Sequence, residues 1–226
     1  MYLSQAKIGA YVKFKSLKEK ACVTKGYSGY FTAQLYNPQD ADLWRVFNKV
    51  GKGTELVCAN SALSLALYGK MGVDNVREAL LYACHYFSYT HVTEPLLFAR
   101  TIGVTYPADA AFMFNREKEA GCFDSELLAE DLAQLRNNDL MVEREWLWLP
   151  ATGCREYNDR KEYAVKTLHA SGYVTNVKSL YSEEADGQVS EDFHTCGVLP
   201  ILAMPWHTKI VKGEGSKESP FEFDWE

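Results

Sequence analysis

Alternating apolar and polar positions predict short β-strands in the first part of this chain and again in its last third. Side chains of a strand point alternately to opposite faces, so each such segment can bury one face of a sheet. Glycines and prolines separate several of the segments, as expected for turns. The strand-like segments are residues 8–14, 21–23, 44–48, 55–58, 63–67, 146–149, 163–168, 173–177 and 198–204.

A different spacing predicts one amphipathic helix between the two groups of strands. Its apolar residues recur at intervals of three and four, which places them on one face of a helix. Asp74 suits the N-cap because its side chain can accept a hydrogen bond from the first turn. We expect the apolar face to pack against the core. That face comprises Val76, Ala79, Leu80, Ala83, Cys84 and Phe87.

The chain between the two strand-rich segments predicts a helical insertion at about residues 105–140. Pro107 suits the first turn of one helix, and Asp124 or Ser125 can begin another. Leucines at intervals of three to five residues then supply the inner face of the second helix.

We therefore expect one domain over residues 1–211, followed by a flexible C-terminal tail at 212–226. Glycine and polar residues dominate the start of the tail, which is typical of a mobile terminus. Its last six residues alternate aromatic and acidic side chains. Two interpretations stay open: a frayed terminus, or a strand added to the sheet of a neighbouring subunit.

The order of several short motifs resembles that of a family of uncharacterised bacterial and prophage-encoded proteins. The resemblance covers residues 8–104 and 146–204. Two departures stand out: Leu199 occupies a position where the family usually has Arg, and residues 153–155 interrupt the family's Ser-Arg position. The matching segments are Trp44–Val46, Glu55–Ala59, Leu67–Gly69, Gly72–Asn75, Ala99–Thr101, Trp146–Ala151, Tyr163–Val174 and Gly197–Leu202.

The late motifs of this series are similar to those of C-type-lectin-like domains, a fold shared with formylglycine-generating enzymes and with receptor-binding proteins of phages. The resemblance implies an α+β fold with a mixed, mainly antiparallel twisted sheet of C-type-lectin-like type, one core helix and the helical insertion. A fold hosts many activities, so function must be argued from the residues of a site.

Composition narrows the classes of function. The chain has 226 residues, of which 47% are hydrophobic, and a net charge of -6. Such a chain can bury a core, and its charge disfavours nucleic acid as a partner. A run of 18 apolar residues and a signal segment are both absent from the sequence, so we expect no membrane partner. The expected location is the cytoplasm of the producing cell, or a virion.

The six cysteines show no Cys-x-x-Cys pair and no Cys/His cluster with the spacing of a zinc site. The acidic residues between 182 and 192 lack the ordered Asp-x-Asp spacing of a calcium loop, although calcium binding there stays open. The sequence therefore predicts no metal and no cofactor.

Two arrangements keep an enzymatic alternative open. Cys196 and His194 lie two positions apart, in or just after the acidic segment, and alternate positions of an extended chain place both side chains on one face, where a thiolate–imidazole pair is conceivable. Carboxylate pairs also occur in or near predicted loops, and paired carboxylates can hydrolyse glycosides. The alternative is thus a small hydrolase-like enzyme that uses Cys196 with His194 or one of two carboxylate pairs, Glu143 with Glu145 or Glu156 with Asp159.

Aromatic residues favour a binding role instead. The sequence holds 14 tyrosines and 5 tryptophans, and several lie in glycine-containing segments typical of recognition surfaces. We predict a non-enzymatic binding or structural module, encoded by a phage or prophage, with a protein or glycan as its partner. Homo-oligomer formation or assembly into a virion is also expected. The candidate binding residues are Tyr27, Tyr30, Arg155, Tyr157, Asp159 and Trp206.

Overall fold

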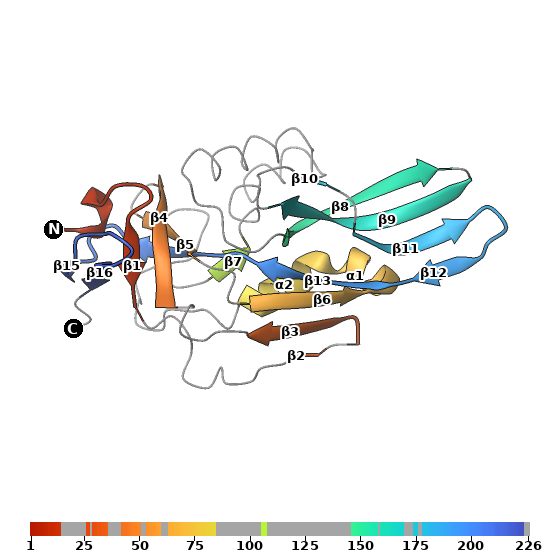
Figure 1. The fold of residues 1–226 in the computed structure, drawn as a ribbon, viewed down its shortest axis with the longest axis horizontal. Coiled ribbons are helices and arrows are strands. Elements are labelled where there is room, and N and C mark those ends of the chain that lie inside the picture. Colours follow the sequence, from red (N-terminus) through yellow and green to blue (C-terminus); the bar gives the residue numbers. More distant parts are fainter. Residues whose placement is uncertain are drawn as a thin grey trace.

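The fold is α+β and consists mainly of β-strands (Figure 1). The computed structural model describes residues 1–14, 26–27, 29–35, 42–50, 53–59, 63–84, 105–107, 146–157, 159–169, 174–175 and 178–223. Two α-helices and one short 3-10 helix accompany the strands in this part of the chain. The α+β class predicted from the sequence is therefore confirmed, but the strands form two sheets rather than one.

The first sheet has seven strands within the described residues and lies beside both termini in Figure 1. Its edge is closed by the N-terminal residues, because the N–H of Ile210 donates to the carbonyl of Met1 and Tyr2 bridges to Lys209. The strand order is β15 (Ile210–Lys212), β16 (Phe221–Phe223), β1 (Tyr11–Lys13), β4 (Leu43–Val50), β5 (Gly53–Cys58), β14 (Pro200–Pro205) and β7 (Thr105–Pro107).

The second sheet contains the other nine strands of the described segments. It is mixed but mainly antiparallel, because β8 and β13 pair in parallel while the neighbouring strands alternate. Its order is β12 (Val189–Glu191), β11 (Ser179–Glu184), β9 (Arg160–His169), β8 (Trp146–Tyr157), β13 (Phe193–Val198), β6 (Leu63–Tyr68), β3 (Phe31–Leu35) and β2 (Gly26–Tyr27), with β10 (Val174–Thr175) against β9.

The chain passes between the sheets where β13 runs into β14 across Leu199. β13 pairs antiparallel with β6 in the second sheet, and β14 pairs antiparallel with β5 in the first. All residues of β5 and β14 are buried, so both faces of this central ribbon are covered. The sequence of β14 is correspondingly apolar, whereas β5 buries Thr54 and Glu55 beside its apolar residues.

The helices lie on one face of the second sheet (Figure 1). α2 (Val76–Cys84) packs on β6, β8 and β13, and α1 (Gly69–Asp74) packs on β9 and β11. The predicted apolar face of α2 is confirmed over its described length, since Val76, Ala79, Leu80, Ala83 and Cys84 are buried. Asp74 is not the N-cap of this helix: it is the last residue of α1.

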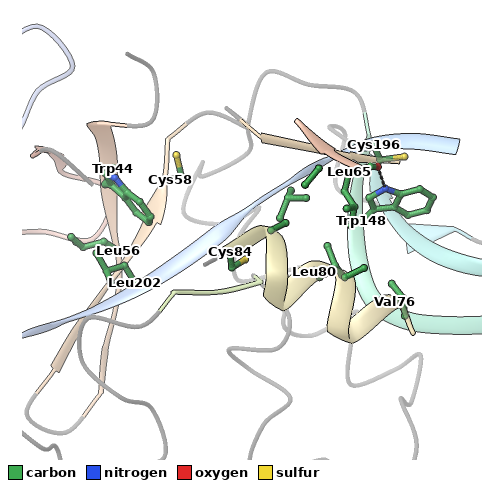
Figure 2. Packing of buried hydrophobic residues seen from close by; sticks show 14 of the residues in the cluster. Trp44, Leu56, Cys58, Leu65, Val76, Leu80, Cys84, Trp148, Cys196 and Leu202 are labelled. Atoms are coloured by element: carbon green, nitrogen blue, oxygen red, sulfur yellow. Dashed lines mark hydrogen bonds between the residues drawn. The ribbon is translucent and has the colours of Figure 1, made fainter. Parts of the chain in front are cut away.

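Trp148 connects the sheet to the core beneath the helices. Its Nε1–H donates a 2.6 Å hydrogen bond to the carbonyl oxygen of Leu65, and the side chain is almost completely buried. Figure 2 shows this bond next to Cys196, with Leu80 and Val76 of α2 on the other side. The same cluster continues to Trp44, Leu56 and Leu202 of the first sheet.

The start of α1 is held by β12, an edge strand of the second sheet. Glu191 of β12 accepts a 3.0 Å hydrogen bond from the backbone N–H of Lys70. Gly69 has a φ of +51°, and a Cβ there would lie 2.7 Å from the Glu191 carboxyl group. The left-handed backbone therefore favours glycine at this position. A carboxylate beside the first N–H groups of a helix is electrostatically favourable.

The structure corrects part of the predictions for the helical insertion and for the C-terminal tail. Pro107 does not begin a helix, because residues 105–107 form strand β7 beside β14. The rest of the predicted insertion, residues 108–140, lies outside the described residues. The tail is not uniformly flexible: β16 pairs in parallel with β1 of the same chain, and Phe221 and Phe223 are buried in its core.

Candidate functional site

A pocket of about 540 Å³ lies where the two helices meet the β8–β9 hairpin. We call it the α–β8 pocket. Its volume is in the range of small-molecule sites in proteins. Apolar side chains from both sides form its body, while a carboxylate, a guanidinium, two hydroxyls and a thiol provide polar groups. The lining residues are Val73, Asp74, Val76, Arg77, Pro150, Thr152, Gly153, Cys154 and Tyr163.

An irregularity in β8 creates the strand side of this pocket. Trp148 pairs with Thr167 of β9 and Thr152 pairs with Val165, so three residues of β8 stand opposite the single Lys166. Pro150, which lacks an N–H, lies in this bulge. Bulges bend a strand and redirect its side chains, and they are frequent beside functional sites. The shift of register caused by the bulge places Thr152 at the pocket.

Beyond the bulge, Cys154 pairs directly with Tyr163, and Tyr163 in turn pairs with Tyr181 of β11. The two tyrosine rings lie 5.4 Å apart, and both hydroxyls donate to Glu183, at 2.6 Å from Tyr181 and 3.4 Å from Tyr163. Burial raises the pKa of Tyr163, helped by the nearby Glu183 carboxylate. The hydrogen bond to Glu183 raises the pKa of Tyr181 to about 12. Both phenols are therefore neutral donors at physiological pH.

Three of the predicted binding residues do lie together, at the tip of the β8–β9 hairpin. Arg155 is exposed and forms an ion pair with Glu162 of the neighbouring strand. Tyr157 pairs with Arg160 in the ladder, and Asp159 forms the turn with a φ of +61°. The tip is thus the end of a regular β-hairpin.

The other predicted binding residues are elsewhere. Trp206 follows β14, close to the N-terminal residues, with its ring edge-on to His207 and 46% of its surface exposed. Tyr27 belongs to β2, the edge strand of the second sheet. Tyr30 is half-buried just before β3, and its ring packs edge-on against Phe31, the first residue of that strand. The structure therefore separates the hairpin-tip candidates from Trp206, because β8 and β9 belong to the second sheet and Trp206 follows β14 of the first sheet.

The predicted acidic loop is also structured. Residues 182–194 complete β11, form the short turn to β12 and start β13. Within the described segments, no three His, Cys, Asp or Glu side chains gather closely enough to hold a metal ion.

Cys196 and His194 do occupy one face of β13, but the surroundings oppose nucleophilic chemistry. Cys196 is buried in the apolar cluster beside Trp148 (Figure 2). Burial raises the pKa of its thiol to about 12, whereas a nucleophilic cysteine needs a lowered value. Of the alternative carboxylates, Glu156 pairs with Lys161 at 3.2 Å, while Glu143 and Glu145 lie outside the described residues.

We expect thiol labelling to separate Cys154 from Cys196 in the folded protein. Cys154 is exposed at the pocket and should react rapidly with Ellman's reagent, since access and thiolate formation control the rate. Cys154→Ser should remove one rapidly reacting thiol. The matched Cys196→Ser variant should leave the native reaction unchanged and remove one thiol only after denaturation. Loss of the fast phase in Cys196→Ser would contradict the buried, neutral thiol.

Comparisons of the chain with protein-family models, with curated proteins and with solved structures find no match. Among the described residues, no helix is long and apolar enough to cross a membrane. The site therefore has to be interpreted from its own geometry.

Sequence reasoning missed most of the α–β8 pocket. Asp74 was considered only as a helix cap, and Cys154 only within an interrupted motif. The available signal was Pro150 inside a strand-like run followed closely by Gly153, since both residues mark irregular strands. The partner side of the pocket could not be read from that signal.

Proposed function

We propose that this protein is a non-enzymatic binding module that receives a group of its partner in the α–β8 pocket. The single observation that carries the proposal is the pocket itself, about 540 Å³ at a bulged strand. The burial and raised pKa of Cys196 remove the main support for the hydrolase alternative.

The lining defines what the pocket can accept. Val73, Val76 and Pro150 are buried and provide an apolar wall, while Thr152 and Cys154 are exposed at the strand side. A mainly apolar cavity with a few polar groups binds ligands that have an apolar body and a hydrogen-bonding end. An aromatic side chain of a protein partner and a substituted sugar of a glycan both have this form.

The motif resemblance supports the finer part of the proposal, a C-type-lectin-like core encoded by a phage or prophage. Its first two late motifs lie in strands β8 and β9, which pair with each other, and the start of the third motif, Gly197–Val198, lies in β13 beside β8. The rest of the third motif, residues 200–202, belongs to β14 of the first sheet. Receptor binding or incorporation into a virion is the role that the resemblance implies, with assembly into oligomers as part of it. These assignments rest on the motifs and their adjacency.

A fragment screen tests the pocket. We expect small aromatic and sugar fragments to shift the methyl NMR signals of Val73 and Val76. Thr152→Trp should fill the opening and weaken the best fragment about tenfold or more, because it occupies the same volume. Gln188→Trp adds the same side chain in the exposed turn of β11 and β12 and should change nothing.

Two outcomes would overturn the proposal. One is equal binding of the fragments by the Thr152→Trp variant and the unaltered protein, or no binding at all. The other is chemical conversion of a bound fragment during incubation, which would establish an enzyme.

A further inference from the structure

The half of β8 that leads to the hairpin tip has an open edge. β9 pairs with one side of it, from Thr152 to Tyr157, in an unbroken antiparallel register. On the other side, β13 pairs with β8 at a single position, Gly197 opposite Leu147, and the two strands separate toward the hairpin tip (Figure 1). Among the described strands, none pairs with this side of β8 beyond the bulge.

The open edge carries backbone groups that another extended chain can satisfy in series. In an antiparallel ladder, alternate residues turn their N–H and C=O away from the partner strand. Every second residue from Thr152 to Tyr157 therefore directs a donor and an acceptor outward, and no backbone group of the described residues bonds to them. The edge is also accessible, because its exposed side chains are Thr152, Cys154, Arg155 and Glu156.

The α–β8 pocket lies directly beside this edge. Thr152, Gly153 and Cys154 belong both to the open segment and to the pocket wall. A glycine inside a strand often marks a place where another backbone approaches closely. When a peptide adds to a sheet edge, main-chain hydrogen bonds provide affinity and pockets for alternate side chains provide specificity. The same three residues of β8 thus offer both a ladder and a pocket.

The helix side of the pocket indicates which side chains an added strand would carry. Val73 and Val76 are buried and apolar, so they favour an apolar residue. Asp74 is exposed and has no hydrogen-bond or ion-pair partner among the described residues, whereas Arg77 is already engaged in an interaction. An exposed carboxylate favours a cationic side chain. Because alternate residues of a strand share a face, a cation two positions from the apolar residue would reach the same wall.

Two other occupants match this edge less well. A glycan has no regular series of amide donors and acceptors with which to continue the ladder. A second copy of the chain could pair its own β8 symmetrically with this one. Its side chains on the pocket face would then be Thr152, Cys154 and Glu156, and none of them is a large apolar group. The apolar body of the pocket would stay unfilled.

We propose that the open edge of β8 binds an extended peptide of a protein partner, which adds as a strand and inserts one apolar side chain into the α–β8 pocket. A lysine or arginine two positions from the inserted residue lies beside Asp74. This inference rests on the proposed function, because it uses the same pocket. It deepens that function by selecting a peptide as the class of partner.

Capped hexapeptides test the proposal, with Thr-Leu-Thr-Phe-Thr-Lys as the reference probe and calorimetry as the measurement. We expect this peptide to bind about tenfold or more tightly than N-acetylphenylalanine amide, because it adds several main-chain hydrogen bonds. N-methylation of one peptide amide at a time should weaken binding with a period of two. Only the amides that face β8 donate to it, so the intervening amides serve as matched controls.

Variants and hydrogen exchange locate the peptide on the protein. Amides at every second residue from Thr152 to Tyr157 should exchange more slowly in the complex, while those of the edge strand β12 should not change. Thr152→Trp should weaken the peptide about tenfold or more, because it fills the pocket. Asp74→Asn should remove the preference for lysine over glutamate at the last peptide position. Glu78→Gln is the matched control, since Glu78 is exposed on α2 but does not line the pocket.

Failure of this inference is distinguishable from failure of the proposed function. If fragments bind in the pocket but the hexapeptides bind no more tightly than N-acetylphenylalanine amide, strand addition is overturned and the pocket remains a binding site. Equal effects of N-methylation at all positions also overturn strand addition. Slow exchange at the β8 edge that depends on protein concentration without peptide would assign the edge to a second copy. If neither fragments nor peptides bind, both proposals are overturned.

Discussion

Trp148→Ala is expected to lower the free energy of unfolding by about 3–5 kcal/mol, the range for removing a large buried aromatic side chain. Two effects act together at this position. The indole fills the space between β6 and α2, and its Nε1–H satisfies the carbonyl of Leu65 through a 2.6 Å hydrogen bond. Trp148→Phe keeps much of the volume but leaves that carbonyl without the indole donor, which costs about 1–3 kcal/mol.

Urea denaturation followed by circular dichroism measures both variants. Trp206→Phe is the matched control, because Trp206 is exposed after β14 and its replacement should change stability by less than about 0.5 kcal/mol. Equal stability losses for Trp148→Phe and Trp206→Phe would show that the buried indole hydrogen bond contributes nothing.

Gly213→Ala is the second large effect, and it tests the attachment of the C-terminal strand. Gly213 has a φ of +92°, and a Cβ there would overlap the carbonyl of Pro220. The chain can relieve this overlap only by moving β16, which removes Phe221 and Phe223 from their positions beside Phe14 and the core. We expect a loss of about 3–5 kcal/mol, comparable to deleting one buried phenylalanine.

Gly187→Ala supplies the control for backbone strain alone. Its φ is +84°, and a Cβ there would meet nothing within 4 Å. It should therefore cost only the left-handed penalty, about 1–2 kcal/mol. Hydrogen exchange at β1 and β16 should accelerate in Gly213→Ala and stay unchanged in Gly187→Ala. Equal stabilities of the two variants would mean that β16 is not held as the structure shows.

The sequence predicted those elements whose pattern is local. α2 was predicted correctly because its apolar residues repeat at the helical period over the described length. The strands at 44–48, 55–58 and 63–67 were also predicted, because Val, Leu and aromatic residues dominate them. Their division between two sheets was not predictable, since the same alternation serves either sheet.

The candidate sites depended on pairings between distant segments. Thr152 and Cys154 reach the α–β8 pocket only because β8 bulges against β9 and because the helices, some seventy residues earlier, pack over it. The edge of β8 beside that pocket is open only because β13 pairs with β8 at Leu147 and otherwise follows β6. Neither register nor bulge position is encoded in the hydrophobic pattern of a single strand.

By itself, the sequence determined the α+β class, the amphipathic face of α2 and the acidic net charge of the chain. Local periodicity and charge are properties of neighbouring residues, so they could be read directly. Only the tertiary structure decided that Cys196 is buried, that the tail forms β16 within its own sheet, and that Trp206 is remote from the β8–β9 tip. Burial and convergence depend on contacts between residues far apart in the chain, and those contacts form only when the strands are ordered and in register.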